Sequence, residues 1–103
     1  MREYNIGAIV SEYELTPNDS HKSFYGKALV RKYASGAQVL FSYNTPVIAV
    51  LNDGKCYDLW GGWSATTGRH IRAFNGMNKA EVRALPLAVK FGMNGAEYIR
   101  ERD

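Results

Sequence analysis

Hydrophobic and polar positions alternate along the first half of the chain in a way that predicts four strands. Ser23–Tyr33 alternates with period two, Gln38–Tyr43 is rich in Val, Leu and Phe, and Lys55–Trp60 follows an Asn-Asp-Gly turn signal. Val47–Leu51 is a continuous apolar run of five residues, which is typical of a central strand that is covered on both faces. We therefore expect an antiparallel meander over residues 23–60.

A helix is predicted directly after the meander. Gly61-Gly62 allows a sharp turn, and Ser64 is a good N-cap for a helix over about 65–75. Thr67, Ile71 and Phe74 recur at i, i+4 and i+7, which forms one stripe that can dock on a sheet. Asn75-Gly76 ends the helix, because glycine adopts the left-handed conformation there at little cost.

The two ends of the chain carry weaker patterns. Ile6–Glu14 is compatible with a strand or a short helix, and we favour the strand; Thr16–Ser20 is a loop. Asn78 can cap a short helix over Lys79–Leu85, which Pro86 ends. Beyond it we expect an edge strand or an extended arm over residues 87–93 and a frayed terminal turn over residues 96–102.

These elements together predict a single α+β domain over residues 1–103. Its core is an antiparallel four- to five-stranded meander sheet, with one main helix packed on one face and a short C-terminal helix. With 103 residues, of which 46% are hydrophobic, the chain can bury one core. It contains no long apolar run and no leader pattern, and its lone cysteine, Cys56, has no partner for an internal disulfide, so we expect a cytoplasmic protein that does not engage membranes.

The charge of the chain is small but unevenly distributed. The net charge is +3, yet residues 20–52 contain four cations and no acid, and residues 59–80 contain Arg69, Arg72 and Lys79 and no acid. Such spans are typical of a surface that meets nucleic acid or an acidic protein. Ordinary solvated surface charge produces the same pattern, so both interpretations stay open.

Two groups of residues are candidates for binding a partner. Tyr25, Lys27 and Arg31 alternate on one face of the first meander strand, where they can stack bases and pair phosphates. The same alternation fits a half-exposed sheet surface with tyrosines over lysine stems.

The second group lies around the predicted helix. Trp60 and Trp63 bracket the Gly-Gly turn, and we expect one of them to fill the core. The other, for which we choose Trp63, would lie partly exposed beside Arg69, His70 and Arg72 and act as a hot spot for a partner.

Catalytic and metal-binding patterns are weak in this sequence. Ser64, Thr66, Thr67 and Cys56 are possible nucleophiles, with His70 and His21 as possible bases, and Thr66 and His70 are spaced i, i+4. No acid in that helix can orient His70, so we expect no catalytic site. Two histidines and one cysteine are too few ligands for a zinc site within one chain, and no cofactor motif is present, so we expect neither metal nor cofactor.

Three segments carry a resemblance to a known family: Lys-Ser-Phe-Tyr-Gly-Lys-Ala at 22–28, Ser-Tyr-Asn-Thr at 42–45 and the Trp-Gly-Gly-Trp-Ser-Ala-Thr-Thr-Gly-Arg-His-Ile-Arg-Ala-Phe segment at 60–74. Over roughly 24–74 the chain resembles small uncharacterised proteins encoded by phages, prophages and plasmids. The resemblance implies a non-catalytic mobile-element accessory protein that binds a host macromolecule, plausible targets being a CRISPR effector or a restriction enzyme. The alternative is a small nucleic-acid-binding module; a hydrolase or transferase is least expected. A homodimer through an uncovered edge strand also stays open.

Overall fold

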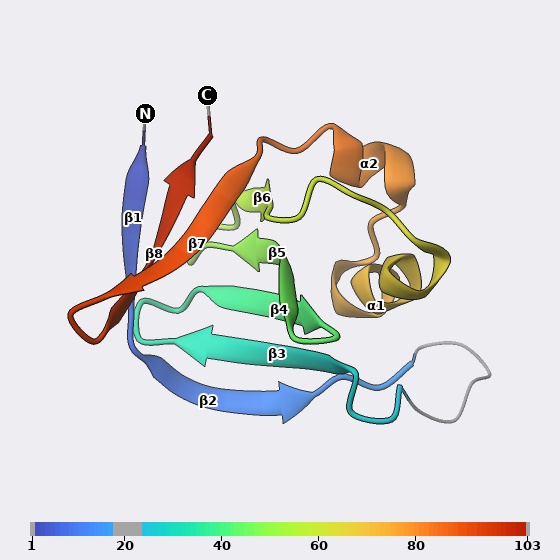
Figure 1. Cartoon of the computed structure of the whole chain (residues 1–103), viewed down its shortest axis with the longest axis horizontal. Helices are drawn as coiled ribbons and strands as arrows, with labels where there is room; N and C mark the ends of the chain where they lie inside the picture. Colours follow the sequence, from blue (N-terminus) through green and yellow to red (C-terminus); the bar gives the residue numbers. More distant parts are fainter. Residues whose placement is uncertain (1, 18–23, 103) are drawn as a thin grey trace.

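The computed structural model describes residues 2–17 and 24–102. Within these residues ten elements follow one another, and they form two antiparallel sheets and two helices (Figure 1). The start of the expected strand at Ser23, most of the expected 16–20 loop, His21 as a possible base and the first two residues of the 22–28 motif lie outside the described residues.

The larger sheet is the predicted meander with one further strand at its edge. Its strand order is β2-β3-β4-β5-β6, and every neighbouring pair is antiparallel. The strands are β2 (Ile9–Glu14), β3 (Ala28–Tyr33), β4 (Gln38–Ser42), β5 (Thr45–Val50) and β6 (Cys56–Asp58). The α+β class and the meander predicted from the sequence are confirmed.

The smaller sheet joins the two ends of the chain. It has the order β1-β8-β7, with β1 (Glu3–Gly7), β7 (Ala88–Met93) and β8 (Ala96–Glu101). The expected frayed turn at residues 96–102 was wrong, because Ala96–Glu101 pairs along its whole length between β1 and β7. Local propensity gives no sign of these long-range partners.

The expected strand over Ile6–Glu14 is divided between the two sheets. The chain leaves β1 at Gly7, which has φ +82°, and enters β2 at Ile9. The β3–β4 turn fixes this corner, because the amide of Ala34 donates to the carbonyl of Ala8 (2.9 Å) and the amide of Ser35 donates to the carbonyl of Ile6 (3.1 Å). Only a residue that tolerates positive φ fits at the corner.

The larger sheet is therefore covered on both faces, as the apolar run at 47–51 indicates. One core lies between the two sheets and includes Ile6, Val39, Tyr57 and Ile99. The other lies between the larger sheet and the helices, with Val30, Leu40, Ile48, Ile71 and Val82. Alternation along β3 and β4 sends successive side chains into opposite cores. In Figure 1 the smaller sheet lies on the left and the helices on the right.

The helices match their sequence signals. The main helix α1 (Ala65–Asn75) is capped by Ser64, whose Oγ accepts from the amide of Thr67 (3.1 Å), and it ends at Gly76 with φ +79°. The short α2 (Lys79–Arg83) begins with a reciprocal capping box between Asn78 and Glu81. Neither helix in the described part of the chain has the length and apolar character that crossing a bilayer requires.

The predicted strand face at Ser23–Tyr33 is corrected by the structure. β3 begins only at Ala28, and the segment before it is a turn with positive φ at Tyr25 and Gly26. Tyr33 is buried between the sheets. Alternation was the wrong interpretation of residues 24–27, because a turn with two left-handed residues precedes the strand.

β2 is one edge of the larger sheet and is exposed along its length. Its register shifts between Ile9 and Ser11, and Glu12 and Glu14 carry charge along it. A bulge and charges are the features that discourage strand pairing between molecules. The homodimer stays a prediction.

Candidate functional site

Helix α1 presents a polar stretch to the end of the larger sheet. Ser42 is the last residue of β4 and faces the helix, where alternation would otherwise place an apolar side chain. Its Oγ lies 2.9 Å from Oγ1 of Thr67 and 2.8 Å from Nδ1 of His70. All three residues are buried, so these hydrogen bonds satisfy groups that water does not reach. We call this group the Ser42 cluster.

His70 is held as a neutral imidazole within this cluster. Its ring is 1% exposed and meets the edge of Phe24, with ring centroids 4.4 Å apart. Burial lowers the pKa of His70 below its usual value, and the neighbouring charge of Arg69 lowers it further. Near neutral pH His70 therefore carries no charge and acts as a hydrogen-bonding group.

Two exposed tyrosines stand beside His70 on unusual backbone. Tyr25 has φ +54° and Tyr43 has φ +51°, in the left-handed region that costs a bulky residue about 1 kcal/mol or more. They are 77% and 51% exposed. The amide of Tyr43 donates to the carbonyl of Lys27 (2.9 Å), which ties the two turns together, and the Lys27 ammonium lies 5.4 Å from the centroid of the Tyr43 ring. Strain of this kind is often concentrated at binding sites.

The tyrosines and α1 surround a small basic depression of about 150 Å³, which we call the basic hollow. The guanidinium carbon of Arg69 lies 5.3 Å from the centroid of Phe24 at this place. The hollow combines aromatic rings, two cations and the buried imidazole. Its lining residues are Phe24, Tyr25, Lys27, Tyr43, Thr66, Arg69 and His70.

A second depression of about 320 Å³ adjoins the basic hollow and shares Tyr43 and Thr66 with it. We call it the hydroxyl hollow, because six of its eight lining residues carry a hydroxyl group. Its lining residues are Ser42, Tyr43, Thr45, Val47, Trp60, Ser64, Thr66 and Thr67.

Asp58 positions the aromatic wall of the hydroxyl hollow. Its Oδ1 accepts from the amides of Trp60 (3.0 Å) and Gly61 (2.9 Å), which fixes the turn between β6 and α1. Trp60 is 38% exposed and lines the hollow. A buried carboxylate that accepts two backbone amides is a stable local anchor, so the ring is held at the rim by the fold itself.

The structure brings together four of the seven residues that the sequence singled out. Tyr25, Lys27, Arg69 and His70 line the basic hollow. The other three lie elsewhere. Arg31 pairs with Glu12 (2.7 Å) and stacks on Phe41, and Arg72 is exposed on α1 but lines neither hollow.

Trp63 packs on the helix instead of lining a hollow. It is half-buried, and its ring lies so close to Gly68 that a Cβ on that glycine would come within 2.4 Å of it. The choice of Trp63 as the exposed ring left Trp60 to fill the core, and the structure corrects this: Trp60 is the more exposed ring and lines the hydroxyl hollow.

Sequence reasoning also missed Ser42, Thr45 and Tyr43. The available signal was Ser42, a polar residue at the end of an apolar strand, followed by a turn at Tyr43 and Asn44. In the structure both turn residues have positive φ. Such a turn is typical of a two-residue hairpin.

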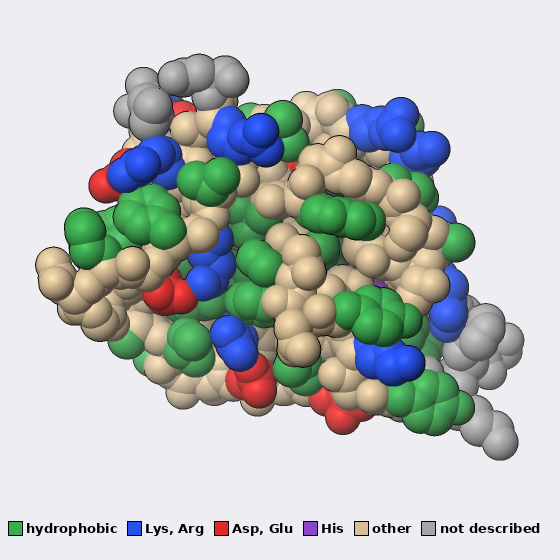
Figure 2. Space-filling model, in the orientation of Figure 1, with side chains coloured by type: hydrophobic (Ala, Val, Ile, Leu, Met, Phe, Trp, Pro, Cys, Tyr) green, Lys and Arg blue, Asp and Glu red, His purple; other side chains and the backbone are tan. Residues whose placement is uncertain are grey.

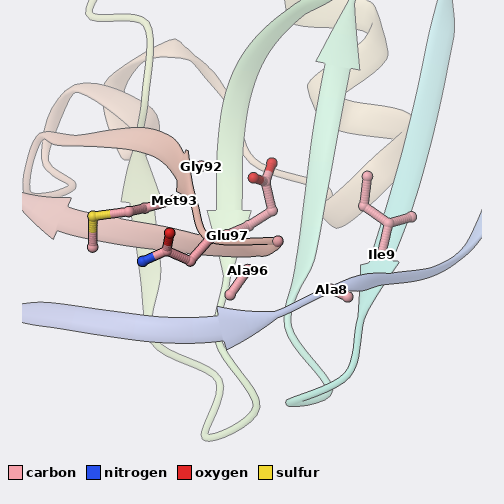
Figure 3. A pocket seen from close by; sticks show the side chains of 8 residues that line it. Ala8, Ile9, Gly92, Met93, Ala96 and Glu97 are labelled. Carbon is pink, nitrogen blue, oxygen red and sulfur yellow. The ribbon is translucent and has the colours of Figure 1, made fainter.

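A third depression lies away from this site, at the tip of the β7–β8 hairpin. Its volume is about 370 Å³, and it is lined by Ala8 and Ile9 on one side and by hairpin residues that include Met93 and Ala96 on the other (Figure 3). The carboxylate of Glu97 lies over Gly92 and pairs with Lys90. This pair joins β7 to β8 within the smaller sheet, and the Lys90 ammonium also lies near the Tyr33 and Phe41 rings of the larger sheet.

The Ser42–His70 hydrogen bond has the form of a nucleophile and its base. Ser42, however, is only 3% exposed, and its Oγ is also bonded to Thr67. Its geometry suits a structural polar link better than attack on a substrate. Thr66, the possible nucleophile at i, i+4 from His70, lines both hollows, whereas the hydroxyl bonded to His70 is that of Ser42.

Within residues 2–17 and 24–102, no three His, Cys, Asp or Glu residues are grouped for a metal ion.

Comparison with known proteins gives one match. Residues 13–86 match the model of a family of unknown function, DUF8033. Searches of curated proteins and of solved structures found nothing that matches the chain. The matched span includes both hollows and α1, and it leaves out β1, β7 and β8.

Proposed function

The chain belongs to the DUF8033 family, and because that family has no known function to transfer, we propose one from the site: a non-catalytic accessory protein that binds a host protein. The binding surface is the basic hollow with its two tyrosines. The resemblance to phage and plasmid proteins supports a host target, and we propose a component of a defence system, such as a CRISPR effector or a restriction enzyme.

The observation that carries this proposal is the pair of exposed tyrosines on strained backbone. Tyr25 and Tyr43 are presented to solvent at a place where the backbone geometry costs free energy. Rigid aromatic side chains next to cations are the residues that dominate binding energy at protein interfaces. Lys27 and Arg69 beside them suit an acidic patch on the partner.

The distribution of charge on one face of the molecule favours a protein partner over a long nucleic acid. On the face in Figure 2, Lys and Arg side chains are scattered among hydrophobic and neutral ones and form no continuous stripe. Tight binding to a nucleic-acid backbone needs a track of phosphate contacts. A compact cluster of aromatic and basic groups fits a protein hot spot better.

A nucleic-acid-binding module is the second candidate. It is favoured by the Lys27 ammonium lying over the Tyr43 ring, since cations interleaved with aromatics are typical of single-strand binding. Here the cations would pair phosphates and the tyrosines would stack on unpaired bases.

The test is affinity capture from host lysate with the tagged protein, with and without nuclease, at low and high salt. The variant Lys27→Glu/Tyr25→Ala removes the proposed contacts at exposed positions. Lys79→Glu, an exposed lysine on α2 that lines neither hollow, is the charge-matched control. A captured protein is then purified and its complex is measured by light scattering.

Under the protein-partner proposal, one host protein forms a stoichiometric complex that survives nuclease. The complex is lost with Lys27→Glu/Tyr25→Ala and kept with Lys79→Glu. Recovery of nucleic acid alone, released by salt, would replace this proposal by the second candidate. A complex that ignores the double variant would contradict the proposed surface.

A further inference from the structure

The two adjoining hollows differ in chemistry across a shared wall. Tyr43 and Thr66 line both of them. On one side are Lys27 and Arg69, whereas none of the described residues that line the other is charged; that hollow is walled by Trp60 and hydroxyl groups. An occupant of both would have an anionic end and a neutral, flat, hydrogen-bonding end.

We propose that these two hollows bind one nucleotide unit. Its phosphate occupies the basic hollow, and its base and sugar occupy the hydroxyl hollow, with the base stacked on Trp60. The basic hollow is also part of the surface proposed for the host protein, so a nucleotide there would compete with that partner; nucleotide binding can nevertheless be measured without the partner.

The basic hollow suits a phosphate. Lys27 is exposed at its rim, and the guanidinium of Arg69 is partly buried against Phe24. Arginine and lysine are the usual phosphate-binding side chains. His70 is neutral near pH 7, so it contributes a polar wall there and no charge.

The hydroxyl hollow suits a base and a sugar. An exposed tryptophan offers a stacking surface that tolerates any base. Thr45, Ser64 and Thr66 are exposed in the hollow or at its rim, and Ser42 and Thr67 are buried hydroxyls whose positions are fixed by the Ser42 cluster. Hydroxyl groups can donate and accept, as base edges and ribose hydroxyls require. The volume of about 320 Å³ lies at the lower end of the range for small-ligand pockets.

The same chemistry can come from a free nucleotide or from one residue of a single strand. Two arms of the experiment separate these sources. One arm uses AMP, with adenosine and inorganic phosphate as its two halves. The other uses a short oligo-dT, in which several nucleotide units are linked.

The measurement is a titration of the full chain by calorimetry and by backbone amide shifts in NMR. AMP is expected to bind with a Kd in the micromolar to millimolar range, and more tightly than adenosine or phosphate alone. Lys27→Glu should raise the Kd for AMP at least about tenfold and leave the Kd for adenosine unchanged. Trp60→Ala should raise the Kd for both ligands about tenfold. Tighter binding of oligo-dT with the same dependence on Trp60 identifies a single strand as the source; binding of AMP alone identifies a free nucleotide.

A variant that fills the hollows distinguishes loss of ligand binding from loss of the fold. Thr66 is exposed on α1 and lines both hollows, so Thr66→Phe fills the space without removing a buried contact. It should abolish AMP binding with the melting temperature unchanged, and Lys79→Glu should bind AMP like wild type. The proposal is overturned if neither AMP nor oligo-dT shifts the amides around the hollows, if phosphate binds as well as AMP, or if Thr66→Phe still binds. None of these results affects the host-protein proposal, which is tested by capture.

Discussion

Ser42 Oγ lies 2.8 Å from Nδ1 of His70, and this hydrogen bond joins the last residue of β4 to the second turn of α1. Together with the bond between Ser42 Oγ and Thr67 Oγ1, it forms a buried polar connection between the larger sheet and the helix beside an apolar core. It also places the helix so that Thr66 and Arg69 lie beside the turns of Tyr25 and Tyr43. The shape of both hollows therefore depends on it.

Removal of the Ser42 hydroxyl is expected to destabilise the protein. Ser42→Ala leaves Nδ1 of His70 and Oγ1 of Thr67 without this partner in a place that water does not reach. The expected loss is about 1–3 kcal/mol in the free energy of unfolding, measured by urea denaturation. Thr45→Ala, which removes an exposed hydroxyl from the same hollow, is the control and should cost much less. Equal losses would mean that the buried cluster is not a stabilising link.

Acidification is expected to destabilise the protein through His70. Its pKa is lowered in the folded state, so the unfolded chain binds a proton first, at a pKa of about 6.5. The stabilising contribution of the neutral form is therefore complete above pH 6.5, falls as pH decreases, and is lost once pH passes below the folded-state pKa.

The measurement is the free energy of unfolding at several values between pH 7.5 and pH 5, for wild type and His70→Gln. The decrease should be larger in wild type, and His21 and the carboxylates cancel because both proteins contain them. Parallel curves would show that His70 titrates alike in the folded and unfolded states.

Trp63 and Gly68 are expected to be energetically coupled. An added Cβ at Gly68 would lie 2.4 Å from the Trp63 ring, although alanine is otherwise favoured over glycine within a helix by about 1 kcal/mol. Gly68→Ala should therefore lower stability by about 1–3 kcal/mol. Trp63→Ala should lower it by about 3 kcal/mol, because the ring packs against the helix-side core.

In the double variant the clash is absent, so its loss should be smaller than the sum of the two single losses by at least about 1 kcal/mol. Chemical denaturation of the four proteins gives this coupling. Additive losses would mean that the two residues do not touch in solution.

The Lys90–Glu97 pair, which joins β7 to β8 within the smaller sheet, is expected to stabilise the protein. The side chains are 10% and 24% exposed, and the Lys90 ammonium also lies 5.7 Å from the centroid of Phe41. Lys90→Met leaves the Glu97 carboxylate poorly solvated, and the expected loss is about 2 kcal/mol. The double variant Lys90→Met/Glu97→Met should lose less free energy of unfolding than Lys90→Met. A larger loss in the double variant would show that each side chain contributes through packing alone.

The charge of Glu97 also affects the pKa of the Tyr33 hydroxyl. Burial raises the pKa of the Tyr33 hydroxyl to about 12, and the charge of Glu97 adds to this effect. Glu97→Gln should therefore lower that pKa, which absorbance at alkaline pH can follow. An unchanged value would indicate that burial alone accounts for the shift.

The candidate site was predictable in part, and the reason lies in its components. Arg69 and His70 lie on a helix whose cap, stripe and end are all encoded locally, so their positions followed from the sequence. Tyr25 and Lys27 were predicted to bind a partner from a strand face, whereas they lie in a turn that borders the basic hollow. Trp60 and Trp63 share the same local sequence signals, and only packing against Gly68 distinguishes them.

The sequence by itself determined the elements whose hydrogen bonds and contacts are local. The meander of β3 to β6, the capped α1 and the capping box of α2 each follow from a period, a turn residue or a cap within a few positions. Tertiary structure decided what depends on partners far along the chain. β8 is a strand because β1, more than ninety residues earlier in sequence, pairs with it, and the two hollows exist because the turns at Tyr25 and Tyr43 meet α1. Those contacts are favoured by burial of side chains from distant segments, and no local pattern records which segments meet.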